Sequence, residues 1–438
     1  MIRTLVHVSV LVLTMSPIAL AGISRGPFLQ DVRTDRVTVG AETDDGSDCI
    51  LQWGHWGEGF GLSLPMSGEG DHHEVTLEGL DASNCYNYRI MCGLRQSPDS
   101  TFCTAPLPGE SFSFVIFGDT RSNHDIHAAV VRAIRAEGVD FYINTGDLVS
   151  DGTVEADWDR FFEAERELLL EIPFYPVVGN HDEDGGKIEI YARLFAPPNG
   201  GSGSENYYAF TYGNARFIIL DNQSMWLGRP EDETEQGKWL ASELEAAYRD
   251  QLIEHTFVLA HQNMYSAKEG RDGDEGLRHW REEMLETGVD WVFSGHDHHY
   301  VRGVADNGLP FIVTGGGGAP LYEVMPEYMT SGDPVEAENF GWLPEPGTNP
   351  YTIYYSLMVN HYIRVDINGP HFSACAKRVD GSADRPGQTF DYFTYGMEPK
   401  LPGGPGCACS TGGIPAAGIA LLLLLLQFLR LSNRNSKS

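Results

Sequence analysis

The sequence predicts an α/β fold, a layered body of strands and helices behind a small β-sandwich, and two patterns carry this prediction. Residues 24–106 alternate apolar and polar side chains in short runs between Gly, Asp and Ser turns, which is typical of a β-sandwich. From Ser111 onward, apolar runs are followed by helical patterns, as in layered α/β proteins. A chain of 438 residues is long enough for more than one core.

The chain begins with the features of a secretory signal peptide. Arg3 precedes an apolar run of about a dozen residues, and the small-x-small sequence Ala-Leu-Ala occupies residues 19–21. We therefore expect residues 1–21 to be removed before Gly22 and the rest of the protein to be exported, to the periplasm or the cell surface. The alternative, a buried first helix, is disfavoured by the helix-breaking Pro17.

The predicted sandwich, residues 22–106, contains four of the seven cysteines. Clustered cysteines in an exported domain indicate two disulfides, with three possible pairings. The four are Cys49, Cys85, Cys92 and Cys103. His72 and His73 lie on a predicted strand of this domain, where one solvent-facing and one half-buried side chain are favoured over metal ligands.

Five apolar runs of the second part each end in a side chain that can bind a metal. Glycines at most of these ends let the backbone turn sharply, and the carboxyl edge of a layered α/β sheet is where active sites collect. A single ending of this kind can arise by chance, but five predict one shared site. The runs end at Gly118-Asp119, Gly146-Asp147, Gly179-Asn180-His181-Asp182, His261 and Gly295-His296-Asp297-His298.

The donors gathered at these ends include two aspartates, one amide and three imidazoles. This mixture suits Mn²⁺, Fe or Zn²⁺. The donors exceed what one catalytic ion needs, so we predict two divalent ions about 3.5–4 Å apart, which clamp the attacking and leaving oxygens of a displacement. A carboxylate can bridge two such ions, whereas a histidine cannot.

The ordered motifs GDTR, GDLV, GNHD, VLAH and GHDH resemble those of the calcineurin-like metallophosphoesterase family. The sandwich in front of them, with RGPFLQDV and FCTAP, is similar to the fibronectin-III-like amino-terminal domain of purple acid phosphatases. The resemblance covers residues 24–395. It implies a four-layer αββα metallophosphoesterase sandwich over residues 111–395.

The resemblance also implies a role for each motif residue. His181 would hydrogen-bond the substrate phosphate and protonate the leaving group, with Asp182 orienting its ring. The nucleophile would be a metal-bound hydroxide, available near neutral pH because the ions lower the pKa of water. The metal ligands would be Asp147 as the bridge, Asp119 and His298 at the first ion, and Asn180, His261 and His296 at the second.

Two positions depart from the family pattern. Many members have His two residues after the first Asp, where this chain has Arg121, and purple acid phosphatases have Tyr three residues after the second Asp, where this chain has Ser150. The first ion therefore lacks one expected protein ligand, which Asn123, His124, His127 or water would replace. Arg121 is open to two interpretations, a charged fork on the substrate phosphate or a structural ion pair.

Several further residues are candidates for supporting roles. The glycine-rich residues 314–320 lack the Lys-Ser/Thr ending of a phosphate-binding loop, so we expect them to close a strand beside the site. Asp221 and Asn222 are favoured as supports of the metal ligands, and His361 as a residue of a late sheet strand. The residues expected to shape the substrate pocket are Trp226, Tyr265 and Tyr322.

The carboxyl end is organised as an anchor. Residues 396–413 form a Pro/Gly linker with a cysteine pair, residues 414–430 are apolar over the short limit of a membrane span, and residues 431–438 are basic. This order of cysteine, apolar helix and basic tail resembles C-terminal sorting tags of the MYXO-CTERM kind. The alternative is a plain single-span anchor.

Charge and motifs together predict the class of function. With 62 acidic and 30 basic residues the net charge is −32, which argues against a nucleic-acid partner because phosphate backbones are bound by clustered Lys and Arg. We expect an exported, membrane-tethered phosphoesterase that hydrolyses small phosphate monoesters. The alternatives are a phosphodiesterase or nucleotidase on the same metal core and, in another class, a non-catalytic surface binding module.

Overall fold

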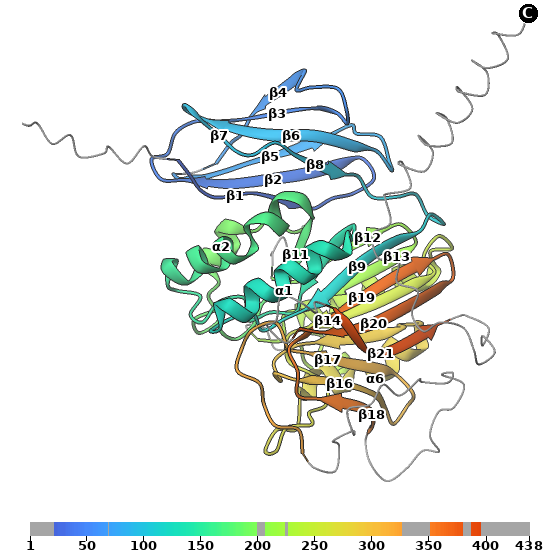
Figure 1. Cartoon of the computed structure of the whole chain (residues 1–438). Helices are drawn as coiled ribbons and strands as arrows, with labels where there is room; N and C mark the ends of the chain where they lie inside the picture. Colours follow the sequence, from blue (N-terminus) through green and yellow to red (C-terminus); the bar gives the residue numbers. More distant parts are fainter. Residues whose placement is uncertain are drawn as a thin grey trace, which may run out of the picture.

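An antiparallel β-sandwich precedes a larger body of two packed sheets with helices outside them (Figure 1). The predicted signal peptide and the linker, apolar segment and basic tail predicted beyond residue 395 lie outside the described residues. The computed structural model describes residues 22–68, 70–198, 206–223, 227–325, 351–379 and 387–395.

The amino-terminal sandwich consists of two antiparallel sheets, whose strands alternate in burial as the sequence pattern predicts. Along β6, for example, every second side chain from Tyr86 to Cys92 is buried. The β-sandwich is confirmed, and its closer likeness to fibronectin III stays a prediction. One sheet has the order β1-β2-β5, with β1 (Ile23–Gln30), β2 (Arg36–Thr43) and β5 (His72–Glu78). The other has the order β4-β3-β6-β7, with β3 (Cys49–His55), β4 (Leu62–Pro65), β6 (Cys85–Cys92) and β7 (Arg95–Gln96), and β8 (Ser100–Cys103) pairs with β6.

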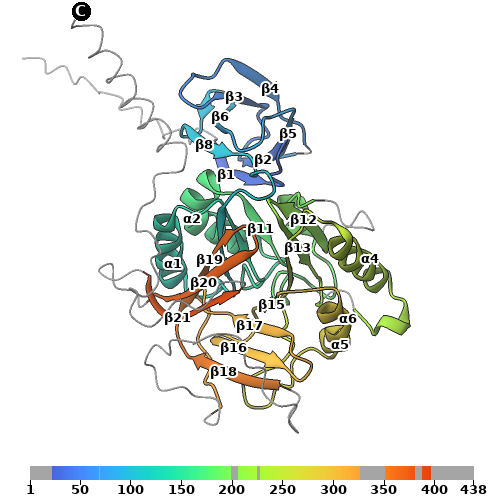
Figure 2. The same cartoon turned by 90° about the vertical axis from the view of Figure 1, so that its right-hand side faces the viewer.

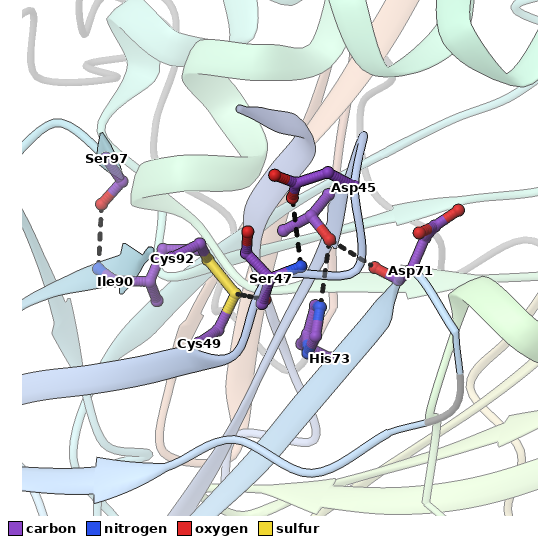
Figure 3. The surroundings of a disulfide bond; sticks show 9 residues. Asp45, Ser47, Cys49, Asp71, His73, Ile90, Cys92 and Ser97 are labelled. Carbon is purple, nitrogen blue, oxygen red and sulfur yellow. Dashed lines mark hydrogen bonds between the residues drawn. A yellow bond between two sulfur atoms is a disulfide. The ribbon is translucent and has the colours of Figure 1, made fainter. Parts of the chain in front are cut away.

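Two disulfides join the strands of the second sheet. Cys49 bonds to Cys92 and Cys85 to Cys103, and each bridge links residues that lie opposite one another on paired strands. The first bridge is shown in Figure 3. Near it His73 is buried, with Nε2 3.1 Å from the Thr43 hydroxyl oxygen. His73 is therefore more buried than expected, and its ring contacts another residue of the sandwich.

The body contains a six-stranded and a seven-stranded sheet, and each has both parallel and antiparallel pairs of strands. The first has the order β11-β10-β9-β19-β20-β21, with β9 (Phe112–Phe117), β10 (Phe141–Asn144), β11 (Phe174–Pro176), β19 (His361–Asn368), β20 (His371–Arg378) and β21 (Gln388–Tyr395). The second has the order β12-β13-β14-β15-β17-β16-β18, with β12 (Tyr208–Tyr212), β13 (Ala215–Ile219), β14 (His255–Ala260), β15 (Trp291–Ser294), β16 (Tyr300–Ala305), β17 (Pro310–Thr314) and β18 (Tyr351–Leu357).

The two sheets pack face to face through aromatic side chains, and helices cover their outer faces. Phe217 meets Phe114 edge-on at 5.1 Å and Phe141 at 5.3 Å between ring centroids. Figure 2 shows α1 and α2 on one side and α4 to α6 on the other. The predicted four-layer αββα architecture is therefore confirmed. The helices are α1 (His124–Glu137), α2 (Glu155–Glu171), α3 (Glu189–Leu194), the short 3₁₀ turn η1 (Pro230–Asp232), α4 (Glu235–Arg249), α5 (Glu275–His279) and α6 (Arg281–Glu286).

The first of these helices shows how the sequence sets its limits. The Asn123 side chain accepts a hydrogen bond from the backbone nitrogen of Ile126, and Gly138 ends the helix at φ 62°. Between them Val130 and Ile134 lie on one face and are fully buried. Helix α1 therefore presents its apolar face to the six-stranded sheet.

The sandwich is seated on the body through β1 and α2. Tyr88 of β6 donates its hydroxyl hydrogen to the Leu170 carbonyl oxygen at 2.6 Å, and Tyr175 of β11 donates to the Val32 carbonyl oxygen at 2.9 Å. Arg25 of β1 pairs with residues of α2 as well as with its own sheet. These contacts fix the sandwich at one end of the body, as Figure 1 shows.

Within the described ranges no helix has both the length and the apolarity that crossing a membrane requires. The segment predicted as a span, residues 414–430, lies outside those ranges. Membrane attachment therefore stays a prediction.

Candidate metal centre

Five strands deliver polar side chains to one place between the two sheets. Asp119, Asp147 and His296 follow β9, β10 and β15 and have left-handed backbones, with φ of 59°, 56° and 67°. A residue other than glycine is rare there and costs on the order of 1–3 kcal/mol, so it persists only where its surroundings hold it. The loops that carry Asp147 and Gly179 are closely packed, because a Cβ atom added at Gly179 would lie 2.1 Å from the Asp147 backbone nitrogen.

One group of acceptors surrounds the ring of His261. Its Nδ1 lies 2.8 Å from the Thr145 carbonyl oxygen and so carries the proton, which leaves a lone pair on Nε2. That Nε2 is 3.3 Å from each of Asp147 Oδ1, Asn180 Oδ1 and His296 Nδ1.

Atoms that all accept hydrogen bonds lie side by side favourably only around a cation. Zinc–nitrogen bonds of about 2.0–2.1 Å in a tetrahedron place neighbouring ligands about 3.4 Å apart, close to the separations around His261. Burial, and after it the charges of His261 and Arg271, lower the pKa of His296 to about 4, so the His296 ring is neutral and one of its nitrogens has a lone pair. This group fits a divalent ion.

A second group shares Asp147 with the first. The ligand atoms of Asp119, Asp147 and His298 all lie within 4.8 Å of one another. His298 donates from Nδ1 to the Pro320 carbonyl oxygen at 2.7 Å, so its Nε2, 3.3 Å from Asp119 Oδ1, offers a lone pair. That buried Asp119 oxygen has no hydrogen-bond partner among the described residues. These donors fit the predicted first ion, the group around His261 fits the predicted second ion, and Asp147 lies between the two.

His181 lies at the open side of the centre. Its backbone nitrogen donates to Asp147 Oδ1 at 2.9 Å and its Nδ1 to the Ser150 carbonyl oxygen at 2.8 Å. Its Nε2 is 4.0 Å from Asp147 Oδ2, and the side chain is 34% exposed. A pocket of ≈ 340 Å³ adjoins it, lined by Ser150, Asp151, Thr153, Asn180, His181, Glu183 and Asp184.

The expectation that Asp182 orients the His181 ring is wrong. The Asp182 carboxylate is buried and accepts hydrogen bonds from the backbone nitrogens of Asp147, Leu148, Val149 and Gly179 at 2.8–3.2 Å. A buried carboxylate needs such donors, and these lie on the protein side of the turn, away from the His181 ring. Burial and the Asp147 charge raise the pKa of Asp182, while the N–H bonds oppose the rise. Asp182 thus ties two ligand-bearing loops together.

Arg121 lies against Asp147 and His298, two ligands of the predicted first ion. Its Nε donates to Asp147 Oδ2 at 3.0 Å, its Nη2 is 3.5 Å from His298 Nε2, and its side chain is 16% exposed. In the structure Arg121 therefore forms an ion pair, with Asp147. The Ser150 hydroxyl oxygen is 3.4 Å from that of Ser122.

Two of the proposed replacements for the missing ligand serve other purposes. Asn123 caps α1. His127 is buried, with Nε2 2.8 Å from Glu165 Oε1, and Tyr142 donates to the same carboxylate at 2.9 Å. His124, in the first turn of α1, is exposed. His124 and water thus stay as the predicted replacements beside the first ion.

The supporting residues fall where expected, apart from Tyr265. The Asn222 side chain donates a hydrogen bond to the Gln262 carbonyl oxygen and accepts one from the Gln262 backbone nitrogen, next to His261. His361 is buried between Val359 and Thr314. Tyr265 packs against Phe311 and Tyr351 away from the centre, so it does not shape the pocket. Trp226 lies outside the described residues.

The glycine-rich loop after β17 packs against the first ligand loop, as predicted. The Gly317 backbone nitrogen donates to the Gly118 carbonyl oxygen, and that of Ala319 to the Asp119 carbonyl oxygen, both at 2.8 Å. The loop therefore closes β17 beside the metal centre.

Sequence reasoning missed the network that holds the GHDH loop. Asp297 is fully buried and accepts hydrogen bonds from Asn263, Ser266 and Arg271. The sequence signal for this network was Asp297 itself, a carboxylate that lies between the two predicted histidine ligands His296 and His298. Its partners come from the loop after β14, and only the fold reveals that contact.

Comparison with known proteins assigns the domain that holds this centre. Residues 112–300 match the family described as calcineurin-like phosphoesterase. The chain carries a calcineurin-like phosphoesterase domain. Two solved structures share its fold, a purple acid phosphatase from yellow lupin (TM-score 0.67, 21% identity, 84% of this chain and 73% of that one) and PhoD (TM-score 0.61, 14% identity, 85% and 90%).

Curated relatives match over shorter stretches. Purple acid phosphatase 22 of Arabidopsis thaliana is 29% identical over 245 residues, 53% of this chain, and phosphoenolpyruvate phosphatase of Allium cepa is 26% identical over 282 residues, 60% of this chain. An uncharacterized Mycobacterium tuberculosis protein is 32% identical over 161 residues, 33% of this chain. The chain spans 54%, 56% and 30% of the lengths of these relatives.

Proposed function

We propose that the chain is an exported hydrolase that cleaves phosphate monoesters at a dinuclear metal centre. The observation that carries the proposal is the convergence of unprotonated imidazole, carboxylate and amide acceptors at 3.3 Å around His261 Nε2, beside the group that contains Asp119 and His298. The phosphatase names of the relatives that match half of the chain or more support it.

Two divalent ions held there would supply an activated water and positive charge for the phosphoryl group. The chain's own residues do the rest. Because the Nδ1 proton of His181 is held by the Ser150 carbonyl oxygen, Nε2 is the atom that would carry the second proton of the imidazolium form, and this is the proton that the leaving group would receive. The adjoining pocket gives the leaving group room, and Asp182 holds the loop that carries Asp147.

A panel of substrates tests the proposal against its alternatives. The full chain, freed of metal and reloaded with Mn²⁺, Zn²⁺ or Fe²⁺, is assayed with 4-nitrophenyl phosphate and bis(4-nitrophenyl) phosphate. We expect faster turnover of the monoester. Faster turnover of the diester would favour a phosphodiesterase, and bound metal without turnover of either ester would favour a non-catalytic binding module.

We further propose that residues 1–21 direct export and residues 414–430 attach the mature protein to a membrane. The charged flanks of both apolar segments support this. We expect the full chain to sediment with membranes, and a chain ending at residue 400 to remain in the supernatant. Equal partitioning of the two would show that the apolar segment is no anchor.

A further inference from the structure

The ring of Tyr322 lies against one of the metal-binding histidines. The rings of Tyr322 and His298 are stacked, with centroids 4.0 Å apart and planes at 19°. The Tyr322 backbone nitrogen also donates to the His298 carbonyl oxygen at 2.9 Å. Two independent contacts thus fix this phenol ring beside the metal centre.

The other face of Tyr322 carries an ammonium group. Lys268 Nζ lies 3.4 Å from the centroid of the Tyr322 ring, in cation–π contact. At these separations the ammonium and the His298 ring cannot share one face, so Tyr322 lies between them. The Lys268 backbone nitrogen donates to the Ser266 hydroxyl oxygen at 3.0 Å, which places the lysine on the loop that also braces Asp297.

This ammonium has no carboxylate partner within the described part of the chain. The neighbouring Arg271 is taken up by Asp297 Oδ1 at 2.7 Å, and Arg121 by Asp147 Oδ2 at 3.0 Å. Burial, and after it the Arg271 charge, lower the pKa of Lys268. Since no carboxylate of the described residues pairs with it, this ammonium is placed to receive an anionic group of a ligand bound at the phosphoester centre.

The two flanks of the centre differ in charge. The pocket beside His181 is lined by Asp151, Glu183 and Asp184, which repel an anionic group. The flank beside His298 offers Lys268 instead. The Tyr322 ring separates Lys268 from His298, so the ammonium is placed to meet a second group of the substrate beside the phosphoryl group.

We propose that Lys268 and Tyr322 form an anion-binding subsite beside the metal centre, which selects phosphoesters that carry a second anionic group, a carboxylate or a further phosphate. This inference rests on the proposed function. Lys268 acts as a specificity-determining residue: it contacts the second anion, and Tyr322 is the platform that positions it.

Paired phosphonates, which cannot be hydrolysed, test the subsite by binding alone. Calorimetry of the metal-loaded full chain compares propylphosphonate with 3-phosphonopropanoate, which adds one carboxylate. We expect Lys268→Ala to weaken binding of the carboxylated ligand about tenfold, the size of one charge-assisted contact, and to leave propylphosphonate within about twofold. Lys268→Arg keeps the charge and should restore most of the affinity, and added salt should shrink the difference.

Lys238→Ala is the matched control, because Lys238 lies exposed on α4 and pairs with Glu233. Equal losses for both phosphonates in Lys268→Ala would overturn the subsite, since Lys268 would then serve the phosphoryl group or the fold. No change for either ligand would overturn it as well. If the wild-type protein binds neither phosphonate, the proposed function itself fails, which is a different outcome.

Discussion

Asn180 and His181 are neighbours in the chain, but their side chains lie in different surroundings. Asn180 Oδ1 is 3.3 Å from His261 Nε2, whereas His181 donates from Nδ1 to the Ser150 carbonyl oxygen. Asn180 is thus placed as a metal ligand, and His181 as a proton carrier at the open side of the centre. One peptide bond separates the two roles.

Replacing these two residues in turn should separate metal binding from chemistry. In Asn180→Ala the second ion loses a ligand, so metal content and rate should fall together. In His181→Ala both ions should remain, while kcat falls by roughly 10²–10⁴ if His181 is the general acid. Elemental analysis and steady-state kinetics on the same samples measure both quantities. Loss of an ion from His181→Ala would show that His181 is a ligand.

Arg121 should weaken binding of the first ion. Its guanidinium is 3.0 Å from Asp147 Oδ2 and 3.5 Å from His298 Nε2, so a divalent ion at Asp119 and His298 meets a positive charge nearby. Charges a few ångströms apart interact strongly in a protein interior. Arg121→Ala should therefore lower the dissociation constant of the weaker of the two Mn²⁺-binding steps by at least about tenfold.

Calorimetric titration of the metal-free protein measures the two steps. Arg135→Ala is the control, because Arg135 forms exposed ion pairs with Glu167 and Glu171 on the outer face of the molecule. Weaker Mn²⁺ binding in Arg121→Ala would mean that the guanidinium supports the site.

At the scale of elements, the carboxyl ends of β9, β10, β11, β14 and β15 could be predicted from sequence because the signal is local. Each is an apolar run that stops at a glycine or a metal-binding side chain. The backbone donors to Asp182, the Lys268–Tyr322 contact and the choice among three disulfide pairings could not be predicted. They depend on which loops meet across the two sheets, and no short window of sequence records that.

The start of β19 should make stability depend on pH. His361 is completely buried and its pKa falls to about 4 because burial disfavours the charged ring. The unfolded chain binds this proton near pH 6.5 and the folded chain does not. Stability due to this residue is therefore complete above pH 6.5 and is lost as the pH falls towards 4, by up to about 3 kcal/mol.

His361→Gln should flatten this dependence. The variant removes the titrating group and keeps a polar side chain near Thr314 and the Val359 carbonyl oxygen. Urea unfolding of metal-free wild type and variant at pH 4.5, 5.5 and 6.5 gives the difference in slope. Parallel slopes for the two proteins would contradict the assignment of this proton to His361.

At the scale of the whole molecule, the sandwich and the body share one hydrophobic cluster, which includes Leu29 and Phe102 of the sandwich and Phe114 and Tyr175 of the body. Hydrogen bonds between the sandwich and the body supplement this shared core. Since the metal ligands come from the body, the sandwich can influence the centre through the body elements that it contacts, which include α2, α3 and β11. Its contribution should therefore be to stability rather than to metal binding.

Arg25 should be the main polar link between the two parts. Its guanidinium, 5% exposed, contacts Glu42 of the sandwich at 2.7 Å and, on α2, Glu155 at 2.9 Å and Asp159 at 2.7 Å. Arg25→Met keeps most of the apolar stem but leaves Glu42 with Arg193 alone. Removing Arg25 leaves the buried Glu42 charge only partly compensated, so we expect the free energy of unfolding to fall by about 3 kcal/mol, the low end of the cost of breaking a buried pair.

Arg36→Met provides the comparison on the same sheet. Arg36 is more exposed and pairs with Asp35 and Glu78 at the surface, where an ion pair contributes less than about 1 kcal/mol. Urea unfolding followed by tryptophan fluorescence compares the two variants, and metal content is measured in parallel. Arg25→Met should lose stability and retain its metals. Equal stabilities for Arg25→Met and Arg36→Met would show that the shared apolar cluster alone joins the sandwich to the body.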